Sequence, residues 1–494
     1  MRANPEPQAQ ARGYSAPQAQ APGTPRSTLP VATGRLKHRR YCFSSENSVY
    51  FLLWRYRRTT VNHPLDRRQW LRYVWASGAA AGLAQLGTTV SPAAEVGEPG
   101  GFQSSIIAKS KVDANRVNAR LVGDRVIQPE TELPVLHRTD VLVVGGGSAG
   151  VVAAIAARRA GADVTLVERY GHFGGLWTGG LVLLILGHIV KGGKQVCQGI
   201  GEEIMQRLEK LDGAIVNRRP GVNPTVDAEA AKYILVEMVQ EAKLKVFLHC
   251  WGVDAIMDGQ SIRGAVFESK AGRQAILAKV VVDATGDGDL LAAAGAEYEH
   301  RSHNVGLVSR IGNLDRVDKQ LASQSPKPRG LGGVTPVPGV NWVNMLGPEV
   351  DGLDIEVLTR MELNHRRFIW QNVQRVRKTP GYEKVYLVET APQLGVRITR
   401  VLAGVKTITR ADLDAGTKFP DVVGVGGASN AEHGEWQIPY GALLPVKIDN
   451  LLAAGRCVSA EMRMADLVRL IPNCFVTGHA AGVAAAVAAM DGCR

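Results

Sequence analysis

One stretch, residues 140–169, constrains the fold of this chain more than any other. It reads DVLVVGGGSAGVVAAIAARRAGADVTLVER. A strand-length apolar run over 141–144 leads into Gly145, Gly147 and Gly150, which stand at GxGxxG spacing. An Ala-rich helical run over 151–160 and a second apolar run over 163–167 follow. A strand, glycine turn, helix and strand within about 30 residues predict a parallel βαβ unit that binds a dinucleotide.

Each part of this unit has a physical task in such binding. The first glycine permits a tight turn, the second lets the backbone approach a pyrophosphate, and the third lets helix and strand pack closely. Ser148 and Ala149 open the helix, whose free N–H groups and partial positive charge favour phosphate. Glu168, at the end of the second strand, can accept hydrogen bonds from a ribose diol.

Three further segments have the composition of cofactor-binding loops. The loop after Glu168, RYGHFGGLWTGG, has glycines that let a backbone pass close to a flat ring or a phosphate. An apolar strand over 274–282 ends in ATGDGD, and another over 450–454 ends in Gly-Arg. The Ala-rich run from Gly478 predicts a helix whose N-terminal dipole stabilises negative charge on a cofactor. The contacts expected in these segments are Arg169, Gly174, Gly175, Thr178, Ala284, Thr285, Gly286, Asp287, Gly455, Arg456, Arg469, Gly478, His479 and Ala481.

These pieces, taken in order, resemble the bacterial FAD-dependent oxidoreductases that are related to the fumarate reductase and succinate dehydrogenase flavoproteins. The resemblance rests on VVGGGSAG, ERYGHFGG, AKVVVDATGDGDLLAAAGA, GVRITR, NLLAAGRCVS and GHAAGVAAA, and it covers residues 141–490. It implies a glycine-rich FAD fold of the glutathione-reductase type with FAD as cofactor. By position it also marks Val253 as a contact to FAD. His479 stands where the family more often has Gln, and MRMADLV at 462–468 is atypical.

The resemblance and the patterns together predict an α/β fold. We expect a Rossmann-like FAD-binding domain with a β-meander, assembled from residues 136–300 and 437–494, and an inserted α+β substrate domain over 301–436. A disordered basic extension over 1–66, an export signal over 67–94 and a linker over 95–135 would precede it.

The inserted segment supplies the candidate catalytic residues, Arg397, Arg400 and His433. Arginines near a flavin can bind a substrate carboxylate or stabilise an oxyanion, and a histidine can act as a general base. The two arginines share a face if the segment is helical and point to opposite faces if it is extended. Surface ion pairs for the arginines and a solvated loop for the histidine are the alternatives.

The charge distribution argues against nucleic acid as a partner. The net charge is +12, but residues 1–90 carry 13 Lys and Arg against three acids, so the remaining 404 residues carry only about +2. The six cysteines are scattered without a CxxC pair, so no metal site or redox disulfide is expected. The sequence contains no run of 18 apolar residues, so we expect no membrane-spanning segment.

Near the N-terminus, DRRQWLRYVWASGAAAGLAQLG followed by SPAA resembles a twin-arginine export signal. We therefore expect the export machinery as a partner and a periplasmic or secreted location, with a mitochondrial transit peptide or a basic amphipathic helix as alternatives. Because 66 residues precede Arg67, we expect translation to start downstream of Met1.

The expected function is that of an FAD-dependent dehydrogenase or oxidase moving a hydride between a small polar substrate and flavin N5, with an electron acceptor that the sequence does not name. The alternatives are a non-redox flavoprotein (an isomerase), an RNA-modifying flavoprotein, or a binding protein without chemistry.

Overall fold

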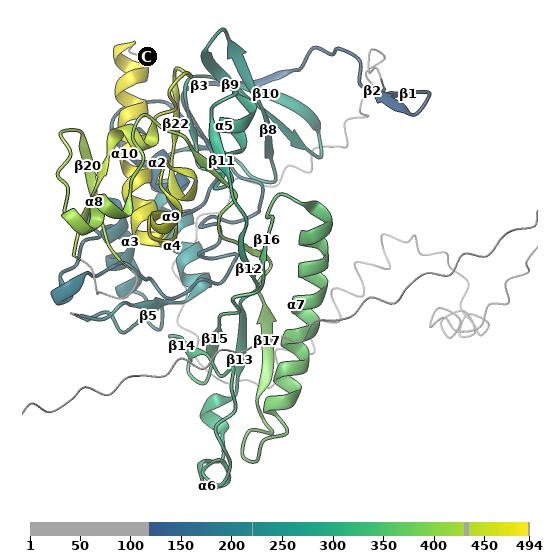
Figure 1. Cartoon of the computed structure of the whole chain (residues 1–494), viewed down its shortest axis with the longest axis vertical. Helices are drawn as coiled ribbons and strands as arrows, with labels where there is room; N and C mark the ends of the chain where they lie inside the picture. The colour runs from purple at the N-terminus through teal and green to yellow at the C-terminus, as the bar shows by residue number, and fades with distance from the viewer. Residues whose placement is uncertain (1–117, 220, 429–433, 493–494) are drawn as a thin grey trace, which may run out of the picture. The chain divides into compact units, whose positions relative to one another are not determined.

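The computed structural model describes residues 118–219, 221–428 and 434–492 (Figure 1). The expected extension, the expected signal over 67–94 and the candidate base His433 lie outside the described residues.

A parallel sheet forms the centre of the described chain. The sheet runs in the order β7 (Lys245–Phe247), β4 (Val164–Val167), β3 (Val135–Val144) and β10 (Gly272–Asp283), and β22 (Leu451–Ala453) pairs in parallel with the far side of β10. The last strand of the chain therefore lies beside a strand from its middle. The fold is mixed α/β, as predicted.

An antiparallel meander grows from the same sheet. β8 (Trp251–Asp258), β9 (Ser261–Ser269) and β10 pair in succession. β3 pairs along one edge of β10 over Ala275–Asp283, whereas β9 and β22 share the other edge, β9 over Gly272–Leu277 and β22 over Val281–Asp283. The strand predicted over 274–282 is confirmed as part of β10.

Two helices cover one face of the parallel strands and pack against each other with their backbones close together. They are α2 (Ser148–Arg159) and α10 (Ile471–Asp491) (Figure 1). A Cβ on Gly478 would lie 2.2 Å from the carbonyl oxygen of Ala149, so only glycine permits this approach. By length and composition α10 could span a bilayer, yet 56% of that window is buried, as in a core helix.

One sequence expectation for local structure needs correction. The helix expected from Gly478 begins two turns earlier, at Ile471, because Pro472 fits the first helical turn. Residues 181–186 are buried or partly buried without forming a helix or a named strand, and Leu181 has φ of +54°. Helix α4 (Ala228–Glu241) follows, and Asp227 caps it.

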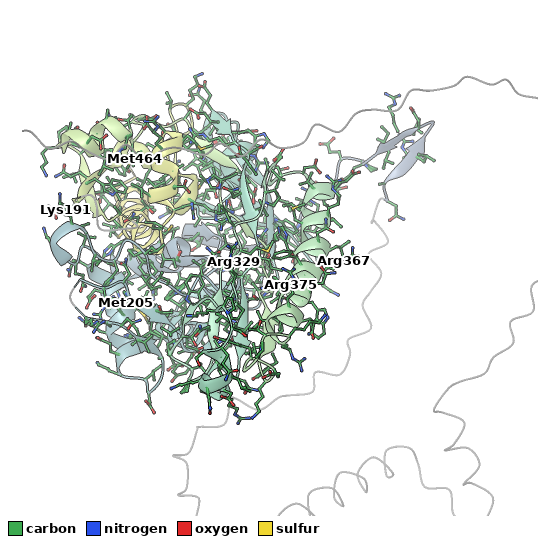
Figure 2. The ribbon with its side chains drawn as sticks, turned by 60° about the horizontal axis from the view of Figure 1, so that its bottom comes forward. Lys191, Met205, Arg329, Arg367, Arg375 and Met464 are labelled. Atoms are coloured by element: carbon green, nitrogen blue, oxygen red, sulfur yellow. The ribbon has the colours of Figure 1, made fainter. Side chains whose placement is uncertain are left out.

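Residues 298–402 form small antiparallel sheets flanked by one long helix, α7 (Ile355–Val376) (Figure 1). Asp354 caps α7 by accepting from the N–H groups of Glu356 and Val357. Its buried face includes Ile369 and Val373, whereas Arg367 and Arg375 are exposed (Figure 2). The strands of this region are β11 (Tyr298–His300), β12 (His303–Gly306), β13 (Ser309–Gly312), β14 (Gly333–Val334), β15 (Asn341–Val343), β16 (Glu349–Val350), β17 (Tyr386–Thr390), β18 (Gly395–Val396) and β19 (Arg400–Leu402).

The remaining helices and strands connect the elements described above or lie at their margins. They are β1 (Arg120–Val122), β2 (Arg125–Ile127), α3 (Gly199–Glu209), β5 (Ile215–Val216), β6 (Thr225–Val226), α5 (Asp289–Ala293), α6 (Lys319–Ala322), α8 (Arg410–Ala415), β20 (Val422–Gly426), β21 (Trp436–Pro439) and α9 (Met462–Val468).

Candidate functional site

A cavity of about 850 Å³ opens at the carboxyl ends of β3, β10 and β22. Its volume falls within the range of ligand and cofactor sites, and its place is where ligands bind in parallel α/β sheets. Most of the candidate site residues line it together: Gly145, Gly147, Ser148, Ala149, Glu168, Arg169, Gly174, Gly175, Ala284, Thr285, Gly286, Asp287, Arg397, Gly455, Arg456 and Arg469.

The three glycines of the first turn are required for different reasons. Gly145 has φ of +103°, and a Cβ there would lie 2.3 Å from the carbonyl oxygen of Ala284. A Cβ on Gly150 would lie 1.7 Å from the carbonyl oxygen of Gly145. At Gly147, however, the nearest atom to such a Cβ is 3.9 Å away. A Cβ at Gly147 would therefore clash with no protein atom, and the open space beside this residue can hold part of a ligand.

Glu168 is held under this turn by backbone hydrogen bonds. The N–H of Gly146 donates to Oε2 (2.6 Å) and that of Tyr170 to Oε1 (2.7 Å). Burial raises the pKa of Glu168, and the two backbone donors offset part of that rise. The carboxylate is thereby fixed beside the cavity that the turn lines.

A buried carboxylate shapes the ATGDGD turn. Asp283 is fully buried and accepts from the N–H of Thr285 (3.0 Å), its Oγ1–H (2.7 Å) and the N–H of Leu291 (2.8 Å). Burial raises the pKa of Asp283, and these three donors lower it. The turn then reaches Gly286, whose φ is +84° and whose Cβ would lie 2.6 Å from Nε of Arg456.

A comparison of the sequence with family models identifies the family and the cofactor of this chain. The model described as FAD dependent oxidoreductase matches residues 140–324 and 322–494. The chain belongs to the FAD-dependent oxidoreductase family. FAD is the cofactor of this flavoprotein. A search of curated proteins finds no match to it.

Solved structures with a similar arrangement are distant from this flavoprotein. A geranylgeranyl bacteriochlorophyll reductase-like protein from Thermoplasma acidophilum is 17% identical over 72% of this chain and 80% of the other, with a TM-score of 0.42. A flavocytochrome c3 fumarate reductase is 17% identical over 72% and 79%, with a TM-score of 0.36. A 3-ketosteroid dehydrogenase from Rhodococcus jostii is 15% identical over 71% and 97%, with a TM-score of 0.36.

The polar atoms around the cavity fit a bound cofactor. Three buried side-chain nitrogens that carry hydrogens and belong to residues lining the cavity have no hydrogen-bond partner among the described residues: Trp177 Nε1, Gln393 Nε2 and Arg456 NH1. Buried polar groups are normally paired, and each unpaired one costs roughly 1–3 kcal/mol. Together with the space at Gly147, these unpaired nitrogens fit a ligand rich in oxygen and nitrogen acceptors, as FAD is.

The N-terminus of α10 faces the cavity with residues that were not predicted from the sequence. Leu470, Ile471 and Cys474 line the cavity, whereas Gly478, His479 and Ala481 do not. These three lie two turns along α10, where Gly478 packs on α2 and Ala481 is buried. The dipole expected of the Gly478 segment thus acts at Leu470–Cys474.

His479 faces a separate hollow, away from the FAD cavity. The hollow is lined by α2, α3 and α10 and includes Arg159 and Glu203, which form an ion pair. Burial, with a contribution from Arg159, lowers the pKa of His479. His479 is therefore not positioned to contact the ring system, contrary to the prediction.

Three other predicted contacts, Gly150, Thr178 and Val253, do not line the cavity. Gly150 packs against the turn, and Thr178 donates through Oγ1 to the carbonyl of Phe173, with its methyl group filling the space behind Gly174. Val253 lies at a bulge in β8, where the pairing register shifts between Gly252 and Asp254. Cys250, Trp251 and Gly252 line the cavity in its place, because the bulge turns Val253 outward.

Arg397 and Arg400 point to different places, because GVRITR is extended between β18 and β19. Arg397 lines the cavity, and its NH1 donates to the carbonyls of Asn304 (2.8 Å) and Leu346 (2.9 Å). Arg400 does not line it. Its NH1 donates instead to the Asp289 carboxylate (2.9 Å), so its contacts position the loop after β10.

The loop after β10 also contains a carboxyl with a strongly shifted pKa. Burial, followed by repulsion from Asp283 and Asp287, raises the pKa of Asp289 to about 6, and Arg400 offsets part of this. Asp287 is itself paired with Arg456 (2.7 Å) and accepts from the Thr399 hydroxyl (2.6 Å). The predicted contacts Asp287 and Arg456 thus form one hydrogen-bonded group.

His303 and Asp466 were missed by the sequence reasoning, although both line the cavity. His303 Nε2 lies 3.3 Å from Asp466 Oδ1, and the Arg469 Nε–H donates to the same oxygen (3.0 Å). The only signal was the atypical MRMADLV stretch, which contains Asp466. Among the described residues no group of three or more His, Cys, Asp or Glu could hold a metal ion.

Proposed function

We propose that this flavoprotein is a dehydrogenase or oxidase that oxidises a small polar substrate. The observation that carries the proposal is the shared lining of one cavity. The glycine turn and Glu168 line it, and so do polar side chains of the 301–400 region, including His303, Gln393 and Arg397. Cofactor and substrate can therefore lie in contact within one enclosure.

The chain's own residues would bind FAD, orient the substrate and shield both from water. The N-terminus of α2 and the open space at Gly147 hold the pyrophosphate, and Glu168 holds the ribose. Trp177 and Leu470 contribute apolar surface that excludes water from the cavity. When bound, FAD supplies a hydride acceptor at its N5.

A dye-linked screen tests this proposal. The purified flavoprotein, loaded with FAD, is mixed with sugars, alcohols, amines and hydroxy acids, and the visible flavin band is followed. We expect at least one class to bleach the band without added reductant, because oxidised flavin loses that absorbance when it accepts a hydride. The proposal is wrong if dithionite bleaches the band and no member of the panel does.

We also propose that the protein is exported after folding, on the strength of Arg67 and Arg68 in the 67–94 segment. Cell fractionation tests this in a bacterium with a twin-arginine pathway. We expect the double substitution Arg67→Lys/Arg68→Lys to retain the protein in the cytoplasm, whereas Arg57→Lys/Arg58→Lys leaves export unchanged. Equal export of both variants contradicts the proposal.

A further inference from the structure

Arg397 is the half-buried arginine of the cavity without a carboxylate partner. Arg456 is paired with Asp287 and Arg469 with Asp466, but no ion pair is formed by Arg397 among the described residues. Its NH1 is used by two backbone carbonyls, which leaves Nε and NH2 without a protein partner in the described chain. Burial and the nearby Arg469 lower the pKa of Arg397, and Asp466 offsets part of this. A desolvated cation in this state favours an anionic ligand.

The fold places His303 next to Arg397. β12 and β18 pair with Val305 opposite Val396. Arg397, the residue after β18, therefore lies beside Asn304, and its NH1 donates to the Asn304 carbonyl. On the other side of β12, His303 pairs with Val350, and Glu349 is exposed next to it. Asp466 faces His303 at 3.3 Å and is itself paired with Arg469.

His303 has the arrangement of a proton acceptor that a carboxylate orients. The nitrogen that faces Asp466 carries the hydrogen in the neutral ring, because a carboxylate is an acceptor. Nδ1 is then the basic nitrogen, and it is buried without a partner among the described residues. An imidazole with one nitrogen 3.3 Å from an aspartate oxygen and its other nitrogen without a partner among the described residues has the arrangement of a general base.

We propose that Arg397 and the His303–Asp466 pair form one subsite for a small 2-hydroxy carboxylate, with Arg397 binding the carboxylate and His303 accepting the hydroxyl proton. This rests on the proposed function. Arg397, Arg469 and Asp466 sum to a charge of +1 with His303 neutral, which one carboxylate balances. A 2-amino acid would add an ammonium group next to these cations and is disfavoured.

The step balances as a two-electron oxidation. The O–H bond breaks and its proton goes to His303 Nδ1. When bound, FAD would be the oxidant that accepts the hydrogen of the same carbon together with both electrons of the broken C–H bond. The oxygen electron pair forms the carbonyl bond, so the product is a 2-oxo carboxylate. Asp466 is a positioning residue here, because it acts through the histidine.

The test uses the FAD-loaded protein and two readouts. The first readout is the binding of acetate, measured as a change in the flavin spectrum. Acetate has no 2-hydroxyl group and so cannot undergo this oxidation. The second is the single-turnover rate of flavin bleaching by glycolate, lactate and malate across pH, with lactamide and alanine as matched neutral and amino compounds. We expect the three hydroxy acids to bleach the flavin, and lactamide and alanine to be slower by roughly 100-fold or more, because a charge-assisted contact is lost or a cation is added.

Variants separate the roles of the residues. Arg397→Met should weaken acetate binding roughly 10- to 100-fold with FAD content unchanged, and Arg367→Met, on the exposed face of α7, should change neither. His303→Gln should keep acetate binding and slow bleaching on the order of 100- to 10,000-fold, removing the limb of the profile that rises with pH. Asp466→Asn should slow bleaching while acetate still binds, because the imidazole loses the carboxylate that faces its Nε2.

The outcomes also separate the inference from the proposed function. If neutral alcohols or sugars bleach the flavin and the hydroxy acids do not, the dehydrogenase proposal stands and the subsite is refuted. If Arg397→Met loses FAD in step with acetate, Arg397 binds the cofactor phosphate and the subsite is likewise refuted. Bleaching by hydroxy acids with an unchanged pH profile in His303→Gln overturns the role of the histidine.

Discussion

Alanine at Gly147 is expected to remove FAD from this protein while leaving its fold in place. The added Cβ meets no protein atom closer than 3.9 Å, and the backbone at this N-cap has φ of −68°, which any residue adopts. Loss of a favourable N-cap glycine costs about 1 kcal/mol or less. The same methyl group fills the space that a pyrophosphate needs, so FAD affinity should fall on the order of 100-fold or more, about 3 kcal/mol.

Gly150→Ala is the matched control, since it adds the same methyl group three residues further on. There the Cβ would lie 1.7 Å from the Gly145 carbonyl oxygen, so the turn cannot form without shifting. We expect a loss of about 4 kcal/mol or more in the free energy of unfolding. Denaturant unfolding of the FAD-free proteins and titration with FAD measure the two effects. If Gly147→Ala retained FAD as the wild type does, the pyrophosphate would not lie at this turn.

Alanine at Asp283 should be the most destabilising substitution of a polar residue in the site. It leaves the N–H groups of Thr285 and Leu291 buried without their acceptor, and it removes the partner of the Thr285 hydroxyl. At roughly 1–3 kcal/mol for each buried unpaired donor, the expected loss is about 3–5 kcal/mol. FAD should be lost as well, because the turn after Asp283 lines the cavity.

Thr285→Val serves as the control for that substitution, because it removes the hydroxyl and keeps the two backbone donors paired with Asp283. The Asp289 N–H also loses the hydroxyl oxygen as its acceptor (3.0 Å), so we expect a cost of roughly 1–2 kcal/mol. Thermal unfolding of both variants, compared with FAD content, measures the difference. An Asp283→Ala variant as stable as Thr285→Val would mean that water takes the place of the carboxylate.

The parts of the fold that the sequence predicted are those built from local patterns. The turn from Gly145 to Gly150 and the acid Glu168 could be predicted because they form one local pattern within about 30 residues: backbone sterics require Gly145 and Gly150, and dinucleotide binding calls for an open backbone at Gly147 and an acceptor at Glu168. The ATGDGD and Gly-Arg segments could be predicted as ligand loops for the same reason. Their meeting at one cavity depends on the pairing of β10 with β22, which is a contact between distant parts of the chain.

The predictions that needed correction depended on register or on tertiary packing. Val253 was chosen by position, and the bulge in β8 moved the lining to its neighbours. His479 was expected at a helix start, but Pro472 begins the helix two turns earlier and so changes which residues face the ligand. His303 and Asp466 are 163 positions apart, and their pairing at 3.3 Å follows no local pattern.

The pairing of β22 with β10 also dictates when the protein can acquire its cofactor during synthesis. Residues 451–491 supply Gly455 and Arg456, the N-terminus of α10, and the glycines that seat α10 on α2. This segment is synthesised after the β3, β10 and inserted parts of the site. The nascent chain therefore lacks β22, Arg456 and the N-terminus of α10 while those earlier parts emerge, and we expect the complete FAD site to form only when β22 closes the sheet.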